Sequence, residues 1–110
     1  LEGLLGDGVQ VVTMDELANH EQVFLLDVRS NTEYAEGYIP GAGRVPVSRV
    51  IWDSSELPDD ATIVAYCASG RRAAVAASAL RRYGYDVAEL DGSYNSWIGQ
   101  PGNVPARPSA

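Results

Sequence analysis

One cysteine lies at a point in the sequence where a thiol can act as a nucleophile. Cys67 directly follows the apolar run Thr62–Tyr66, which is typical of a buried strand. The small residues Ala68-Ser69-Gly70 come next, then Arg71 and Arg72, where an Ala-rich helical segment starts. The spacing therefore predicts a strand, a six-residue loop that begins with the cysteine, and the N-terminus of a helix.

Such a loop favours an ionised thiol. The first N–H groups of a helix have no partner within the helix and carry a partial positive charge. Helix N-termini and neighbouring arginines lower the pKa of a cysteine thiol from about 8.5 to roughly 3.5–7.5. We expect Cys67 at the rim of the loop, with its thiolate stabilised by loop amides and by Arg71 and Arg72. Gly70 permits the positive φ that such a loop needs.

The alternative reading is structural. A lone cysteine is most often a buried, inert, small hydrophobic residue, and arginines at a helix start can simply be solvated. Two observations favour the reactive thiol. Cys67 lies in a Cys-x-x-Gly-x-Arg pattern at a strand-to-helix junction. Cations are also unfavourable at a helix N-terminus, so Arg71 and Arg72 indicate that an anion binds nearby.

Composition narrows the choice of function. The chain has 110 residues, 45% of them hydrophobic, which predicts one globular domain. Its net charge of −7 argues against nucleic acid or an anionic membrane as a partner, and no apolar run approaches the roughly 18 residues of a membrane helix. One cysteine and one histidine, His20, exclude an internal disulfide and a Cys/His zinc site, so we expect no metal and no cofactor. We expect His20 on the surface.

The pattern of elements predicts an α/β fold. Strand patterns cover Val9–Val12, Val23–Leu26, Thr62–Tyr66 and Val87–Leu90. Helices are predicted over Met14–Asn19, from the capping box Ser30–Glu33 up to Gly37, and over Val47–Trp52, Arg72–Tyr83 and Ser93–Ile98. The first of these opens with a second capping box, Thr13–Glu16. Strands that alternate with helices indicate a parallel sheet covered on both faces. Ligands bind at the carboxyl ends of such strands.

Charged residues follow the strand that ends near Asp27. We expect Asp27 to accept hydrogen bonds from loop amides and Arg29 to pair with Glu33, so that the three support the active loop. The functional alternative is that Arg29 adds positive potential to the pocket. We expect Trp52 and Trp97 to pack in the core.

Three segments together resemble the rhodanese family. These are the loop Cys67–Arg72, the stretch Asp27–Ala42 with its Ile-Pro-Gly-Ala, and the closing segment Leu90–Pro101. Tyr38 stands where that family often has His, and Ser93 replaces the second glycine of a frequent Gly-Gly pair. The resemblance implies a rhodanese-like three-layer α/β/α fold with a central, mainly parallel, five-stranded sheet. Residues 9–101 would form this domain, with an N-terminal extension at 1–8 and an irregular tail at 102–110.

The resemblance also implies a thiosulfate sulfurtransferase of the rhodanese type. Cys67 would take the outer sulfur of a small anionic donor such as thiosulfate and carry it as a persulfide. The amides of Ala68, Ser69, Gly70, Arg71 and Arg72 would cradle the persulfide, and a thiol, a protein or cyanide would accept the sulfur.

Two alternatives stay open. The first is a carrier or regulatory module of a larger protein. Its motive is that the chain begins at Leu1 and not at Met, which leaves room for an upstream domain or signal. The second is an arsenate reductase or phosphatase, although those enzymes use a loop one residue longer. With no visible signal peptide and a lone cysteine, we expect a cytoplasmic protein.

Overall fold

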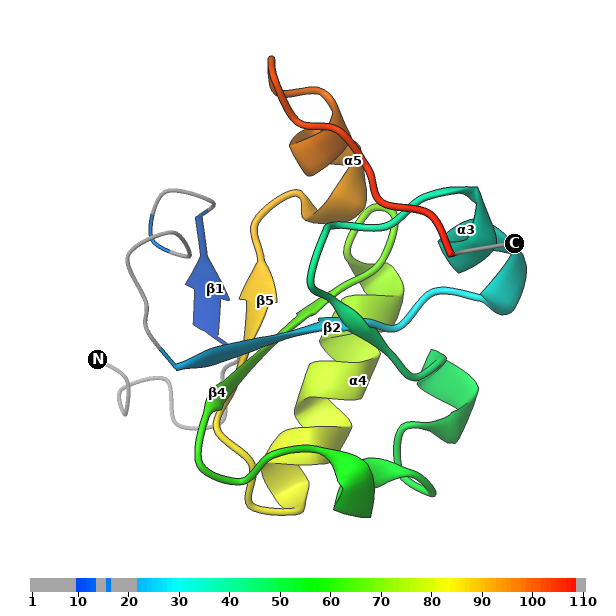
Figure 1. Cartoon of the computed structure of the whole chain (residues 1–110). Helices are drawn as coiled ribbons and strands as arrows, with labels where there is room; N and C mark the ends of the chain where they lie inside the picture. Colours follow the sequence, from blue (N-terminus) through cyan, green and yellow to red (C-terminus); the bar gives the residue numbers. More distant parts are fainter. Residues whose placement is uncertain (1–9, 14–15, 17–21, 109–110) are drawn as a thin grey trace.

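A parallel five-stranded sheet forms the centre of the protein (Figure 1). The structure is a computed structural model, and it describes residues 10–13, 16 and 22–108. The strands are β1 (Gln10–Val12), β2 (Val23–Asp27), β3 (Gly43–Arg44), β4 (Thr62–Tyr66) and β5 (Val87–Leu90). They lie in the order β1-β5-β4-β2-β3, and every pairing is parallel. The predicted parallel sheet is confirmed.

A local sequence signal explains where one of the helices begins. Helix α3 (Asn31–Glu36) starts at the predicted capping box, in which Ser30 and Glu33 bind each other's backbone N–H. The hydrogen bonds of the box between Thr13 and Glu16 are also present. The described residues also form the helices α4 (Arg71–Arg82) and α5 (Ser93–Ile98).

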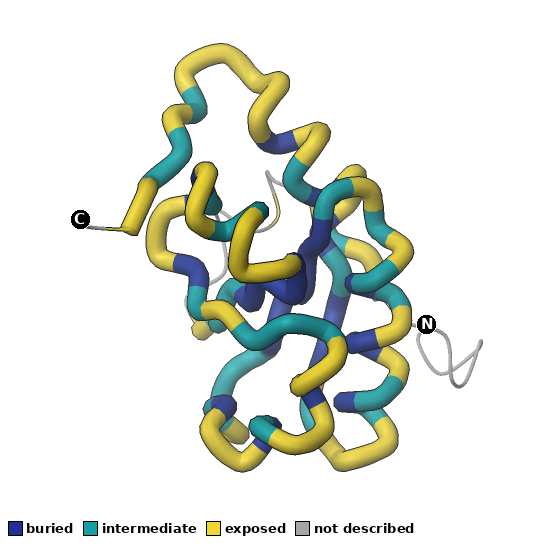
Figure 2. The backbone as a smooth tube through the Cα atoms, turned by 90° about the vertical axis from the view of Figure 1, so that its right-hand side faces the viewer, coloured by how far each residue is buried: buried dark blue, intermediate teal, exposed yellow. Residues whose placement is uncertain are grey.

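The two faces of the sheet carry separate cores. Side chains alternate along β4, so Ile63 and Ala65 belong to the cluster that includes the α4 alanines, and Val64 and Tyr66 belong to the cluster on the other face. Trp97 of α5 lies in that second cluster, which confirms its predicted burial. Figure 2 shows the buried stretches gathered in the middle of the molecule, with exposed backbone around them.

The segment after β3 differs from the prediction. It forms two 3₁₀ turns, η1 (Val47–Arg49) and η2 (Ser54–Glu56), and not one helix over residues 47–52. The backbone N–H of Val47 donates to the carbonyl of Val28, so this segment is tied to the end of the sheet. Val50 fills the core, whereas Trp52 is 76% exposed. The predicted core position of Trp52 is wrong because the turn directs it outward.

Some predictions concern residues outside the described part of the chain. They are the N-terminal extension, most of the helix Met14–Asn19, and His20. The described part of the C-terminal tail is irregular, and it is anchored by an antiparallel bridge between Tyr38 and Ala106. Among the described helices, none has the length and apolar character needed to cross a membrane.

Candidate active site

The active-site loop begins at the carboxyl end of the central strand. Cys67 follows β4, whose neighbours are β2 and β5. The sequence suggested that the thiol lies at the rim of the loop. Cys67 is instead only 1% exposed, so the thiol lies at the base of the loop. The chain returns to the sulfur at Gly70, the residue that immediately precedes α4.

One loop amide points at the sulfur. The backbone N–H of Gly70 donates to Cys67 Sγ at 3.0 Å. Gly70 has a φ of 119° and immediately precedes α4. Glycine adopts this left-handed conformation without a side-chain penalty, and the conformation lets the amide face back toward the sulfur. The sulfur therefore accepts a hydrogen bond at the positive end of a 12-residue helix.

The start of the loop is held by α5. The backbone N–H of Cys67 donates to Ser93 Oγ at 3.2 Å, and the carbonyl of Cys67 accepts from Tyr94 N at 2.9 Å. The carbonyl of Ala68 accepts from Asn95 N at 3.0 Å. These contacts satisfy two of the N–H groups that the first turn of a helix leaves unpaired. Sequence reasoning assigned no contact to these α5 residues. The departure at Ser93 from the family's Gly-Gly pair was the available signal.

The other end of the loop is tied to α3. Arg72 donates to both carboxylate oxygens of Glu33, at 2.6 and 2.9 Å. This pair lowers the pKa of Glu33 to about 2, with Arg72 as the largest cause. Glu33 in turn raises the pKa of Arg72, and Cys67 adds a smaller contribution to the same shift. Arg71 is exposed at the surface of the loop.

The predicted pairing of Arg29 with Glu33 is wrong, because Arg29 pairs with Asp27 and Glu33 pairs with Arg72. Asp27 accepts hydrogen bonds from one loop amide, the backbone N–H of Arg29 just after β2, and from the Arg29 guanidinium. Arg29 also donates to the carbonyl of Gly37 at 2.6 Å, and its guanidinium lies 4.1 Å from the ring centroid of Tyr94. Both charged residues are buried because a two-residue separation lets them form a closed ring of hydrogen bonds at the end of β2.

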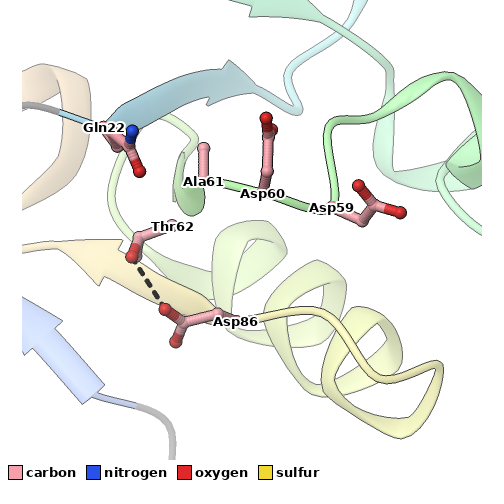
Figure 3. A pocket seen from close by; sticks show the side chains of 6 residues that line it. All are labelled: Gln22, Asp59, Asp60, Ala61, Thr62 and Asp86. Carbon is pink, nitrogen blue, oxygen red and sulfur yellow. Dashed lines mark hydrogen bonds between the residues drawn. The ribbon is translucent and has the colours of Figure 1, made fainter.

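A pocket lies at the end of β4 opposite to Cys67 (Figure 3). It is lined by Gln22, Asp59, Asp60, Ala61, Thr62 and Asp86. Thr62 Oγ1 donates to Asp86 Oδ2 at 2.7 Å. Thr62 is the first residue of β4, and Cys67 follows the last residue of the same strand. The pocket therefore lies a whole strand length from the thiol. Its three carboxylates, from Asp59, Asp60 and Asp86, disfavour an anionic ligand at this position.

Comparison with known proteins identifies the family to which the sequence is similar. The family model described as "Rhodanese-like domain" matches residues 11–100. A sulfurtransferase from Allochromatium vinosum is 39% identical over 82 residues, which cover 74% of this chain and 77% of that protein. The thiosulfate sulfurtransferase GlpE from Pseudoalteromonas translucida is 31% identical over 83 residues, 74% of this chain and 79% of that protein.

Solved structures share the fold, and some relatives are longer. A rhodanese-like domain protein from Staphylococcus aureus superposes with a TM-score of 0.80 at 28% identity, covering 92% of this chain and all of that chain. The HTH-type transcriptional regulator Rv0324 from Mycobacterium tuberculosis is 35% identical over 86% of this chain, but the match spans only 44% of that regulator.

Proposed function

Because the chain belongs to the rhodanese-like domain family, we propose that it is a sulfurtransferase that carries sulfur as a persulfide on Cys67. The observation that carries the proposal is the hydrogen bond from the Gly70 amide to Cys67 Sγ. A charge-assisted hydrogen bond stabilises the thiolate more than the thiol, and the thiolate is the nucleophilic form. On this proposal the backbone amide of Gly70 activates the cysteine.

In the first half-reaction, the thiolate of Cys67 attacks the outer sulfur of the donor. With thiosulfate, a new S–S bond forms to Cys67 and the bond between the outer sulfur and the sulfonate breaks. Sulfite leaves with the electron pair of that bond. The outer sulfur of the resulting persulfide carries the negative charge, which the amides of Ala68 to Arg72 would stabilise as preorganised donors.

In the second half-reaction, a nucleophilic acceptor removes the outer sulfur. A thiolate or cyanide attacks it, the S–S bond to Cys67 breaks, and Cys67 leaves as a thiolate. The enzyme returns to its starting form, so the cycle is a double displacement. The natural acceptor would be a thiol or a protein that presents one, and a reducing compartment such as the cytoplasm would keep Cys67 free to react.

The donor site favours a small anion. Arg71 at the loop surface offers a positive charge, and Arg72 lies behind it with its charge shared with Glu33. Because Cys67 is buried, a small donor should reach its sulfur more readily than a bulky one. Thiosulfate fits both conditions, and one relative carries thiosulfate in its name.

Intact-mass spectrometry tests the proposal directly. Thiosulfate alone should make the wild-type protein one sulfur atom heavier, and cyanide should restore the original mass. Cys67→Ser should not gain mass because the alcohol is too weak a nucleophile. A wild-type protein whose mass stays unchanged with thiosulfate and with other sulfane donors would contradict a catalytic role.

A regulatory or carrier module is the second candidate, because one relative is a transcriptional regulator of which this chain covers less than half. Sulfur loading on Cys67 with negligible turnover to any acceptor would favour this module. A phosphatase or arsenate reductase is disfavoured by the short Cys-x₄-Arg spacing from Cys67 to Arg72. Turnover of an aryl phosphate that depends on Cys67 would favour a phosphatase over a sulfurtransferase.

A further inference from the structure

Ser93 adopts a backbone conformation that L-residues avoid. Its φ is +55°. Among the described residues, Ser93 is the one residue other than glycine that has a positive φ. It follows Gly92, whose φ is +73°, so two consecutive left-handed residues turn the chain from β5 into α5. A left-handed conformation costs an L-residue free energy that glycine does not lose. A contact made by the Ser93 side chain offsets this cost.

That contact is with the nucleophile's own backbone. The N–H of Cys67 donates to Ser93 Oγ at 3.2 Å, and both residues are almost completely buried. The sheet ladder stops just before this point, because the last pairs of β4 are Ala65 with β5 and Tyr66 with β2. The Ser93 hydroxyl thus supplies the acceptor for the first amide beyond the ladder. Without it, that buried amide would lose its partner.

A second contact makes the arrangement rigid. The carbonyl of Cys67 accepts from the backbone N–H of Tyr94 at 2.9 Å. Adjacent residues of α5 therefore hold the amide and the carbonyl of the same residue. Two such contacts fix both peptide planes around Cys67, and these planes set the direction in which its side chain projects. The projection in turn places the sulfur 3.0 Å from the Gly70 amide.

We propose that Ser93 is a positioning residue for the sulfur-transfer reaction, and that its hydroxyl aims the Cys67 thiol at the Gly70 amide through the Cys67 backbone. The role in sulfur transfer rests on the proposed function, whereas the hydrogen bonds around Cys67 do not depend on it. A small error in the position of a reacting atom lowers a rate strongly. Ser93 therefore affects the reactivity of the thiol more than the stability of the fold.

Ser93→Gly separates these two effects. Glycine relieves the strain of the left-handed turn but leaves the buried Cys67 N–H without its acceptor, so the two effects on stability oppose each other and the melting temperature should change little. The rate at which iodoacetamide alkylates Cys67 at neutral pH should fall about tenfold, roughly the value of one hydrogen bond. The pH at which alkylation reaches half its maximal rate should also move upward, because the sulfur loses its aligned donor. Ser93→Ala, which keeps a side chain, should show the same loss of reactivity with a lower melting temperature.

Ser96→Ala is the matched control. It removes an exposed hydroxyl one turn further along the same helix and should change neither the rate nor the pH midpoint. Wild-type alkylation rates and midpoints in folded Ser93→Gly and Ser93→Ala would overturn the proposal. Alkylation does not depend on sulfur transfer, so the two proposals fail separately. A wild-type protein that takes no sulfur from any donor contradicts the proposed function, whereas an unchanged Ser93→Gly protein contradicts only the role of Ser93.

Discussion

Arg72 and Glu33 are 39 positions apart in the sequence and meet in a two-pronged ion pair at 2.6 and 2.9 Å. The same carboxylate accepts from the backbone N–H of Ser30 at 3.0 Å and so completes the capping box of α3. One side chain therefore joins the start of α3 to the end of the active-site loop. The charge of Glu33 also offsets that of Arg72, which moderates the positive potential that an incoming anion meets.

Replacement of Glu33 by glutamine should change catalysis more than folding. Glutamine still serves at this position of a capping box, so α3 should persist. The loss of the negative charge frees Arg72, and the loop should hold an anion more tightly but with less defined geometry. We expect the KM for thiosulfate to fall and kcat to fall several-fold, as measured in steady-state sulfur transfer to cyanide. Glu36→Gln, on the exposed end of the same helix, is the control and should leave both constants unchanged.

The same pair should make stability depend on pH in the acid range. The pKa of Glu33 is about 2 in the folded protein against an ordinary value of 4.5. A lowered pKa stabilises the fold in full above pH 4.5, and this stabilisation is lost as the pH falls toward 2. Because both side chains are about one-third exposed, the contribution should be about 1 kcal/mol or less. Urea unfolding should give a difference between wild type and Glu33→Gln that is larger at pH 7 than at pH 3. An equal difference at both values would contradict this assignment.

The elements that place the loop could be predicted because their signals are local. The strands Thr62–Tyr66 and Val87–Leu90 and the helix Ser93–Ile98 match the sequence patterns residue for residue. Apolar runs and capping boxes depend on residues a few positions apart. The direction of Trp52 was missed because it depends on how the preceding turn is tied to Val28, a contact that no local pattern encodes.

The ion pairs and hydrogen bonds of the candidate site were harder to predict. Several acids and arginines are available, and spacing does not decide which pair across the fold. The sequence therefore suggested Glu33 for Arg29, whereas packing brings Glu33 to Arg72. The burial of Cys67 was missed for a similar reason, since it depends on how the loop folds back over its own first residue.

The buried pair of Asp27 and Arg29 should be essential to the fold. Asp27→Asn leaves the Arg29 guanidinium without its counter-charge in a site where both side chains are at most 5% exposed. Breaking such a pair on one side costs about 3–5 kcal/mol, which urea unfolding at neutral pH should detect. Asp53→Asn is the matched control, because it breaks the ion pair of Asp53 with Arg49 at the surface and should cost about 1 kcal/mol or less. Equal effects of the two substitutions would show that burial adds nothing to the Asp27 pair.

Gly70→Ala should separate the role of the loop amide from ordinary backbone strain. An alanine at φ 119° would meet no atom within 4 Å, so its cost is conformational, about 1–2 kcal/mol. Relief of that strain requires rotation of the backbone that now aims the Gly70 N–H at Cys67 Sγ. Gly84→Ala is the matched control, because Gly84 has a φ of 93°, equally open surroundings, and a place at the far end of α4. Both variants should lose similar stability in thermal unfolding. Only Gly70→Ala should lower the rate of persulfide formation from thiosulfate, by about tenfold, the equivalent of one hydrogen bond. Equal rates of sulfur loading in the two variants would remove the Gly70 amide from the mechanism and leave the activation of Cys67 to other groups.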